Sequence, residues 1–326
     1  MVKNIDQVID HNYEDLFTIV GTSEENIEKL ETAPYSYWRE TFKQLWKNPL
    51  AILCVIGIIV LVLMAIVGPW IKQYNIYTNG GTVSLDEFEP YLPPNADNWL
   101  GTGGTKMGYF KGLDLWTLVW YGTRLSLILG TVIALIDTFL GLLIGSLWGY
   151  FKWLDPIMLE LRNFINNIPT LLLYILLMKF LERSFWTLVF VMCMFGWMGL
   201  AGFIRNQIII IRNREYNIAS QTLGSSPKAM ITHNLLPYLI SVIVTVVSTA
   251  IPAAISAEVG LSFFNLSFRA HENVTLGQLL TAATSDAWQT YPYLLIAPMI
   301  VLVPLTVTFF YLGLALADAT DPKNHR

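Results

Sequence analysis

Long apolar runs separated by short polar segments make up most of the chain from residue 50 onward. A helix rises about 1.5 Å per residue, so about 20 mostly apolar residues cross the roughly 30 Å hydrocarbon core of a bilayer. The first run begins too far from the N-terminus, and is too long, for a cleaved signal peptide. The pattern predicts an all-α membrane protein with six transmembrane helices, at residues 50–71, 125–151, 164–181, 185–204, 238–264 and 293–317.

The third run is interrupted at its start by Asn166, Asn167 and Pro169. Lys and Arg counts decide whether it crosses, because cytoplasmic loops of membrane proteins carry an excess of these residues. Six spans with a cytoplasmic N-terminus place 13 of the 20 Lys and Arg residues inside, whereas omitting the third span gives equal shares. The charge distribution therefore favours six spans, with both termini on the cytoplasmic side of the cell membrane.

A shorter amphipathic pattern precedes the first span. Trp38, Phe42, Leu45 and Trp46 recur at helical spacing, while cationic side chains occupy other faces. This pattern predicts an interfacial helix at the headgroup level, and a helix packed on soluble protein is the alternative. The sequence therefore predicts five segments. A cytoplasmic tail with the interfacial helix (1–49) precedes the first span (50–71) and an extracytoplasmic loop (72–123). A membrane core with five spans and a long inner loop at 205–237 follows (124–318), and a cytoplasmic C-terminal tail (319–326) ends the chain.

Composition agrees with a membrane protein and excludes several other classes. The chain is 54% hydrophobic and only 13% charged, which is difficult to reconcile with a soluble domain. The net charge of -4 and the scattered basic residues indicate no nucleic-acid surface. Cys54 and Cys193 lie in apolar runs, where packing is the expected role of a thiol, and the four His residues show no ligand spacing. We therefore expect no metal site.

Two features inside the spans suggest specific roles. Asp137 lies near the middle of the second span, where translocon scales put a charged residue at about 2.5 to 3.5 kcal/mol unless it is solvated, paired or protonated. It is expected to face a translocation pathway, or else to make a structural hydrogen bond within the bundle. Gly141, Gly145 and Gly149 repeat at four-residue spacing and predict a face that another helix approaches closely, although glycine is also generally frequent in membrane helices.

The longest predicted inner loop contains residues that typically begin and end helices. Residues 214–237 read as a short helix, a break at Gly224, a second short helix opened by Ser226 and Pro227, and a stop at Pro237. These signals predict a rigid elbow on the membrane surface.

This loop resembles the signature of the membrane subunits of binding-protein-dependent ABC importers, which is Glu-Ala-Ala, a glycine four residues on, and a Leu-Pro pair ending thirteen residues after that glycine. Ala219, Gly224 and the pair Leu236 and Pro237 fall into this register, with Ser220 at the second alanine position. Two positions depart from the signature. Ile218 stands where the family usually has glutamate, and Asn234 stands where it often has an aliphatic residue.

Other segments are similar to the C-type subunit of oligopeptide and dipeptide permeases, and the likeness covers roughly residues 35–322. The matching stretches are residues 98–102, 114, 121–126, 258–264 and 317–322. An insertion at about 103–111 and Leu113 in place of an arginine are departures. The resemblance implies a permease subunit of an oligopeptide importer, working with a different sister permease, two cytoplasmic ATPase subunits and an external lipid-anchored receptor that delivers the peptide.

The resemblance also implies roles for individual residues. The elbow is expected to dock on the ATPases, which bind ATP and Mg, through Ala219, Ser220, Leu223, Gly224, Ser225, Leu236 and Pro237. This chain is not expected to be an enzyme or to hold a cofactor, because residues 101–106 lack the Gly-Lys-Ser/Thr spacing of a phosphate loop. In the outer loop, Trp99, Gly101, Thr102 and Asp114 are candidates for receptor docking, and capping of the bundle is the alternative.

Two other functions are weighed against this one. An ion-coupled secondary transporter would use Asp137 and Glu258 as coupling carboxylates, but it gives no reason for a glycine elbow in the cytoplasm. Within the importers, nickel or another small chelate is the rival substrate, and no histidine falls in a predicted span. A membrane-embedded enzyme is disfavoured, since no paired carboxylates or nucleophile constellation lies within the spans.

Overall fold

A computed structural model of the chain describes residues 37–71, 89–105, 107, 110–267, 274–285 and 288–320. Contacts divide the chain into two units, Met1–Glu40 and Thr41–Arg326, and the arrangement below is that of the second unit. Every regular element in the described ranges is a helix, so the prediction of an all-α protein is confirmed. The expectations for residues 1–34, for 72–88 of the outer loop and for 321–326 of the C-terminal tail lie outside the described residues.

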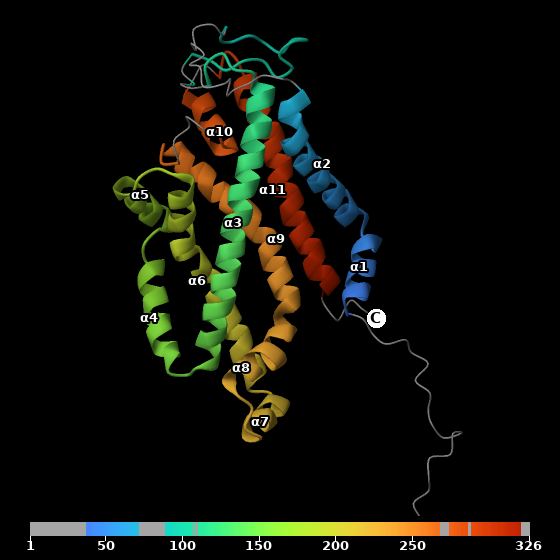
Figure 1. Cartoon of the computed structure of the whole chain (residues 1–326), viewed down its shortest axis with the longest axis vertical. Coiled ribbons are helices and arrows are strands. Elements are labelled where there is room, and N and C mark those ends of the chain that lie inside the picture. Colours follow the sequence, from blue (N-terminus) through green and yellow to red (C-terminus); the bar gives the residue numbers. More distant parts are fainter. Residues whose placement is uncertain are drawn as a thin grey trace, which may run out of the picture. The chain divides into compact units, whose positions relative to one another are not determined.

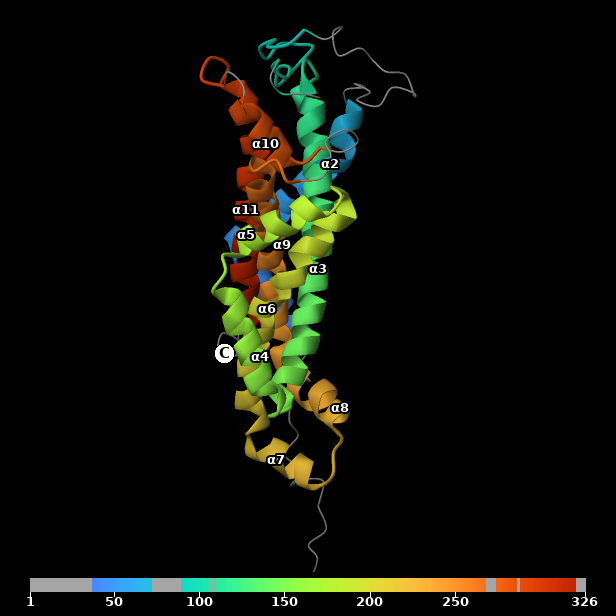
Figure 2. The ribbon, with the colours of Figure 1, turned by 90° about the vertical axis from the view of Figure 1, so that its left-hand side faces the viewer.

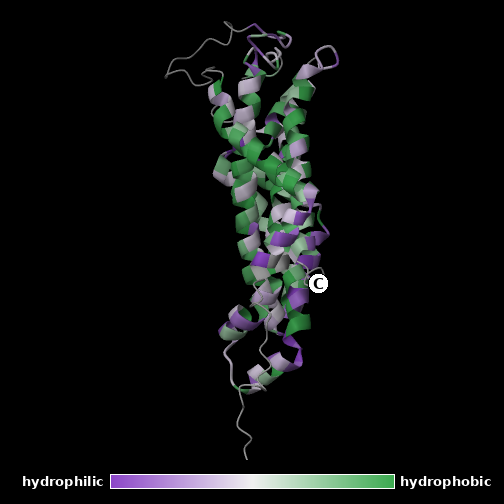
Figure 3. Ribbon diagram, turned by 90° about the vertical axis from the view of Figure 1, so that its right-hand side faces the viewer, coloured by the Kyte–Doolittle hydropathy of each residue, from purple (hydrophilic) through white to green (hydrophobic). Residues whose placement is uncertain are grey.

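Among the described residues, five helices are long and apolar enough to cross a membrane. They are α2 (Pro49–Ile71), α3 (Leu115–Tyr150), α6 (Phe185–Arg212), α9 (Ile240–Phe263) and α11 (Tyr293–Thr320). Figure 1 shows them running alongside one another, with α3 near the middle, and Figure 3 shows hydrophobic residues along most of their length. A sixth candidate span is the bent pair α4 (Leu154–Asn166) and α5 (Thr170–Phe180).

The bend between α4 and α5 is 81° and falls where the sequence predicts an interruption. Asn167 ends α4, and its side chain donates a hydrogen bond back to the Asn163 carbonyl at 2.8 Å. Pro169 follows, and a proline both lacks an N–H group and disfavours helical backbone in the residue before it. The third predicted span is thus two helices, and the amphipathic α4 was not part of that prediction.

Two predicted boundaries differ from the structure. Helix α3 begins at Leu115, ten residues before the predicted span, because the Asp114 carboxylate caps it by accepting a hydrogen bond from the Thr117 N–H at 3.0 Å. Helix α6 continues to Arg212, whose guanidinium donates to the Gly149 and Tyr150 carbonyls at the end of α3. Both helices therefore extend past the ends of the predicted spans, while the loop bounds 72–123 and 205–237 stay predictions.

The closest helix pair is α3 with α6, which run side by side (Figure 1). A Cβ atom on Gly145 would lie 2.7 Å from the Ala201 carbonyl oxygen, and one on Gly149 would lie 2.8 Å from Ile208 Cβ. A Cβ on Gly141 would lie 2.8 Å from Leu200. The glycine repeat is therefore a packing face, and the helix that it contacts is α6 of the same chain.

The two ends of the bundle differ. At one end, residues 213–239 form a projecting loop that includes α7 (Glu215–Thr222) and α8 (Pro227–Ala229). At the other end lie α10 (Leu276–Ser285) and the irregular residues 89–114, as Figure 2 shows. Before α2, α1 (Tyr37–Lys47) is the helix predicted from the amphipathic pattern. Its Phe42 and Trp46 are exposed, as an interfacial helix requires, whereas its position at the membrane surface stays a prediction.

Candidate functional site

The projecting loop has the two short helices and the glycine break that the sequence predicts. Helix α7 ends at Thr222, and Gly224 has a φ of +87°, a left-handed conformation that glycine adopts without steric cost. Ser226 then caps α8 by accepting a hydrogen bond from the Ala229 N–H at 3.3 Å, with Pro227 in its first turn. A π-helical turn, Met230–Leu235, and a 3-10 turn, Leu236–Leu239, join the loop to α9.

A buried polar cluster holds the two arms of the loop together. Asn217 is 0% exposed, and its amide donates to the Ile211 carbonyl at 2.8 Å. The Asn234 amide lies 3.3 Å from Asn217 Oδ1 and 3.4 Å from Ser220 Oγ, and the Ser220 hydroxyl pairs with Ser225 at 2.8 Å. Asn234, which departs from the family signature, thus contacts Ser220, which stands at the second alanine position of that signature. The sequence had no signal for the role of Asn217, because an isolated Asn in a loop is ordinary.

The tip of the loop exposes large apolar side chains beside polar ones. Leu223 is 88% exposed, and Ile218 and Tyr216 are also exposed. No atom of the described residues lies within 4 Å of a Cβ built on Gly224, so this glycine leaves space around the tip of the loop. Partial desolvation of the Tyr216 hydroxyl, and then its hydrogen bond with Tyr238, raise the pKa of Tyr216 above its usual value. The loop therefore offers a protein partner a stiff, mostly uncharged knob.

The predicted coupling residues divide by burial. Ala219, Leu223, Gly224 and Pro237 are exposed, and Ser220, Ser225 and Leu236 are half-buried. Leu236 packs against the apolar cluster formed by Ile204, Ile208 and neighbouring residues. The structure thus gathers all seven residues in one loop, where four can contact a partner and three also support the shape of the loop.

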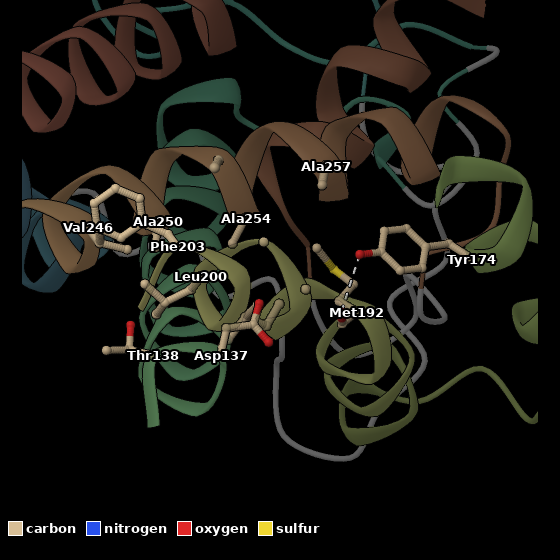
Figure 4. A pocket seen from close by; sticks show the side chains of 14 residues that line it. Asp137, Thr138, Tyr174, Met192, Leu200, Phe203, Val246, Ala250, Ala254 and Ala257 are labelled. Atoms are coloured by element: carbon tan, nitrogen blue, oxygen red, sulfur yellow. Dashed lines mark hydrogen bonds between the residues drawn. The ribbon is translucent and has the colours of Figure 1, made fainter. Parts of the chain in front are cut away.

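A second feature is a cavity of about 400 Å³ among α3, α5, α6 and α9. Figure 4 shows the Asp137 carboxylate projecting into it, with Tyr174 of α5 on another wall. Asp137 Oδ1 has no hydrogen-bond partner among the described residues, and a Cβ on Gly196 would collide with the carboxylate. The rest of the wall is mainly small or apolar: Ile133, Thr138, Met192, Gly196, Gly199, Leu200, Phe203, Val246, Ala250, Ala253, Ala254 and Ala257.

Glu258, the other candidate pathway carboxylate, does not line this cavity. It is 0% exposed, and its Oε1 accepts hydrogen bonds from the hydroxyls of Ser262, Thr275 and Ser267 at 2.6, 2.7 and 3.1 Å. Because Thr275 directly precedes α10, the carboxyl group links that helix to α9. The structure therefore places Glu258 outside the cavity at Asp137, and its role in a pathway stays a prediction.

The candidate docking residues of the outer segment are mostly internal. Thr102 and Asp114 are buried and form an isolated antiparallel bridge, while Gly101, at φ +82°, lies against Tyr293. Trp99 is exposed and its ring contacts that of Trp116 edge to face. Of the four residues, only Trp99 is exposed, because the other three fold the segment over the end of the bundle.

Sequence reasoning missed an ion pair near the loop end of the bundle. Two guanidinium nitrogens of Arg205 donate to the two oxygens of Asp155, both at 2.7 Å, and Trp148 Nε1 also donates to that carboxylate. The Arg205 guanidinium lies 5.6 Å from the Trp148 ring centroid. Only the folded chain brings these residues together, so no spacing in the sequence could have indicated them. Within the described residues, no cluster of His, Cys, Asp and Glu could hold a metal ion.

Comparison with known proteins assigns the family. Residues 139–325 match the family described as binding-protein-dependent transport system inner membrane component, and residues 36–94 match the N-terminal TM domain of oligopeptide transport permease C. The chain is 33% identical to the oligopeptide transport system permease protein AmiD of Streptococcus pneumoniae, over 92% of this chain and 94% of the relative. It is 32% identical to the dipeptide transport system permease protein DppC of Bacillus subtilis, over 89% and 87% of the two chains. The chain therefore belongs to the binding-protein-dependent transport system inner membrane components, and it is a membrane permease of this family.

Proposed function

We propose that this chain imports oligopeptides as one permease subunit of an ATP-driven transporter in the cytoplasmic membrane, with both termini cytoplasmic. The names of its relatives, which are oligopeptide and dipeptide permeases, support the substrate class. The observation that carries the mechanism is the projecting loop, which is stiffened by the Asn217 cluster and exposes Leu223 beside a left-handed Gly224. A stiff loop of this kind can dock by shape and transmit rigid-body movement to the helices.

The proposed assembly contains one sister permease, two ATPases that bind ATP and Mg, and an external lipid-anchored receptor. The loop docks on an ATPase, and the outer segment with Trp99 meets the receptor. Peptide passes along the cavity at Asp137, whose carboxylate projects into it with one oxygen that has no hydrogen-bond partner among the described residues. A chelated metal fits this cavity less well, because neither His nor Cys is among the residues that line it.

Replacing Gly224 with Val tests the coupling role. Valine disfavours the left-handed backbone and adds bulk at the tip, and strain of this kind costs about 1 to 3 kcal/mol, or roughly a 5- to 150-fold loss in the docking equilibrium. The variant should reach the membrane and keep its sister permease, yet release the ATPases or hydrolyse ATP without importing peptide. Membrane yield, ATPase retention and peptide uptake are measured in one preparation.

Gly224→Asn is the matched control, because Asn tolerates left-handed backbone while still adding a side chain. If Asn restores coupling, strain is the cause of the loss; if it does not, the partner needs the space. Wild-type uptake with full ATPase retention in Gly224→Val would show that this loop is not the coupling element.

Leu223→Asp tests the same contact without altering the backbone. Leu223 is so exposed that its loss should not destabilise the chain, whereas an aspartate in a desolvated interface should weaken docking by about 2 kcal/mol, or roughly 30-fold. Co-purification of the ATPases measures the effect, and Thr222→Ala on the adjacent exposed position is the control. Unchanged retention of the ATPases by Leu223→Asp would place the contact elsewhere.

A further inference from the structure

Helix α4 has an unusual distribution of polar residues. Asp155 and Arg162 lie on the side that faces α6, where Asp155 pairs with Arg205 and the Arg162 guanidinium lies against Gly202. A Cβ on Gly202 would be 2.5 Å from Arg162 Nη1, so the glycine leaves room for the arginine. The inward side of this helix is therefore polar, which is the reverse of a helix on a soluble protein.

The opposite side of α4 is apolar and exposed. Ile157, Leu161 and Phe164 recur at four- and three-residue spacing, and Phe164 is 68% exposed. Such a stripe suits lipid or an apolar partner at the level of the membrane. Together with α5, α4 also passes the composition test for a membrane span. Helix α4 therefore has the composition of part of a membrane span.

One edge of α4 does not fit contact with lipid. Glu160, Asn163 and Asn167 lie three and four residues apart, so they share an edge, and all three are exposed. The other edge, with Leu154, Met158 and Ile165, is apolar and half-buried. An exposed carboxylate and two amides are costly in hydrocarbon, so the environment of this edge in the membrane must be water, a polar ligand or a polar protein surface.

The neighbouring edge of α6 leads from this place to the cavity. Gly199 lines the cavity, and Asn206 lies seven residues further along, about 10 Å away on the same edge of the helix. Asn206 is exposed, and Gly202, which contacts Arg162, lies between them in the sequence. Gly199 and Asn206 thus share one edge of α6, which also exposes Phe203 and leads from the cavity at Asp137 toward the loop end of the bundle.

We propose that the polar edge of α4, formed by Glu160, Asn163 and Asn167, lines the inner half of the peptide route. The proposal rests on the proposed function. Each Asn amide carries both donors and an acceptor, so it can hydrogen-bond the main chain of a peptide whatever its side chains are. The expected ligand is therefore the main chain of a peptide in a water-filled route. The polar edge contributes to transport without selecting a peptide sequence.

Single-cysteine labelling in the complete transporter tests this assignment. The background replaces Cys54 and Cys193 with Ala, and Glu160→Cys, Asn163→Cys and Asn167→Cys are compared with Ile157→Cys and Phe164→Cys on the apolar side of the same helix. Inside-out vesicles without nucleotide are treated with a charged, membrane-impermeant methanethiosulfonate. The polar-edge cysteines should react about 10-fold faster or more, because the reactive thiolate forms in water and not in hydrocarbon.

Transport supplies the second readout. Labelling at Asn163→Cys should reduce peptide uptake severalfold, whereas labelling at Phe164→Cys should leave uptake unchanged. Equal or slower reaction of the polar edge in the complex would overturn the proposal and assign this edge to a contact with another subunit. Peptide uptake by the unlabelled cysteine-free background tests the proposed function separately. A complex that carries no peptide would contradict the proposed function, while the labelling rates would still show which edge of α4 is accessible to water.

Discussion

Asp137 and Glu258 lie within the apolar helices α3 and α9, and their surroundings differ in a way that indicates their roles. Around Glu258, three hydroxyls donate to Oε1, the side chain is 0% exposed, and Oε2 is buried beside Gly277. Around Asp137, small and apolar side chains leave a cavity of about 400 Å³. Each carboxyl group keeps one oxygen without a hydrogen-bond partner among the described residues, so the difference is that hydroxyls enclose Glu258 whereas Asp137 faces a cavity.

This contrast shows why an acidic residue in a span cannot be assigned from its position alone. Both residues carry the same cost of burial if they are left without partners. Three hydroxyls offset part of that cost at Glu258, where Thr275 comes from a different segment, whereas mainly small and apolar side chains surround Asp137. Glu258 is therefore expected to control stability, and Asp137 to control transport.

The largest effect is expected from Glu258→Leu. Leucine removes the acceptor of three buried hydroxyls at once, and buried polar groups left unsatisfied cost about 1 to 3 kcal/mol each in the least favourable case. The yield of folded protein and its midpoint of thermal unfolding in detergent should both fall sharply. Glu258→Gln, which keeps an acceptor and the shape, should recover most of both. If the Glu258→Leu protein is stable and transports peptide, Glu258 is not needed to hold α9 and α10 together.

A smaller effect, confined to transport, is expected from Asp137→Asn. The change keeps the shape and removes the charge, so the complex should assemble with an unchanged unfolding midpoint while peptide uptake falls about 10-fold, equivalent to roughly 1.4 kcal/mol. Phe139→Leu, two residues away and exposed on the outside of α3, is the control and should keep full uptake. Normal transport by Asp137→Leu would show that the cavity carboxylate has no function in the route.

The smallest effect is expected from Ser262→Ala. This change removes one of three donors to Glu258 and leaves the other two, so unfolding should cost only about 0.5 to 1.5 kcal/mol less than in the wild type. Thermal unfolding measures the change, and peptide uptake should stay at the wild-type level. A loss of transport without a loss of stability would show that Glu258 and its hydroxyls act in the peptide route and not in stabilising the fold.

The sequence predicted much of the fold because membrane helices depend on local properties. Runs of apolar residues located α2, α9 and α11 closely, and Pro169 located the break between α4 and α5. The start of α3 was missed by ten residues, since a hydropathy run marks the apolar layer and not the helix, which continues into the outer segment as far as its Asp114 cap. The loop was predicted well because Gly224, Ser226 and Pro227 act on their own backbone.

The sequence by itself determined the class of protein, the approximate spans, the elbow with its glycine and the family signature, because each depends on residues close together in the chain. Only the tertiary structure decided which helix the glycine repeat contacts, that Asn217, Ser220 and Asn234 meet, and that Glu258 is enclosed while Asp137 faces a cavity. These outcomes depend on which distant segments supply hydrogen-bond partners and volume. Thr275, for example, reaches Glu258 from 17 residues further along the chain, and no local pattern encodes that meeting.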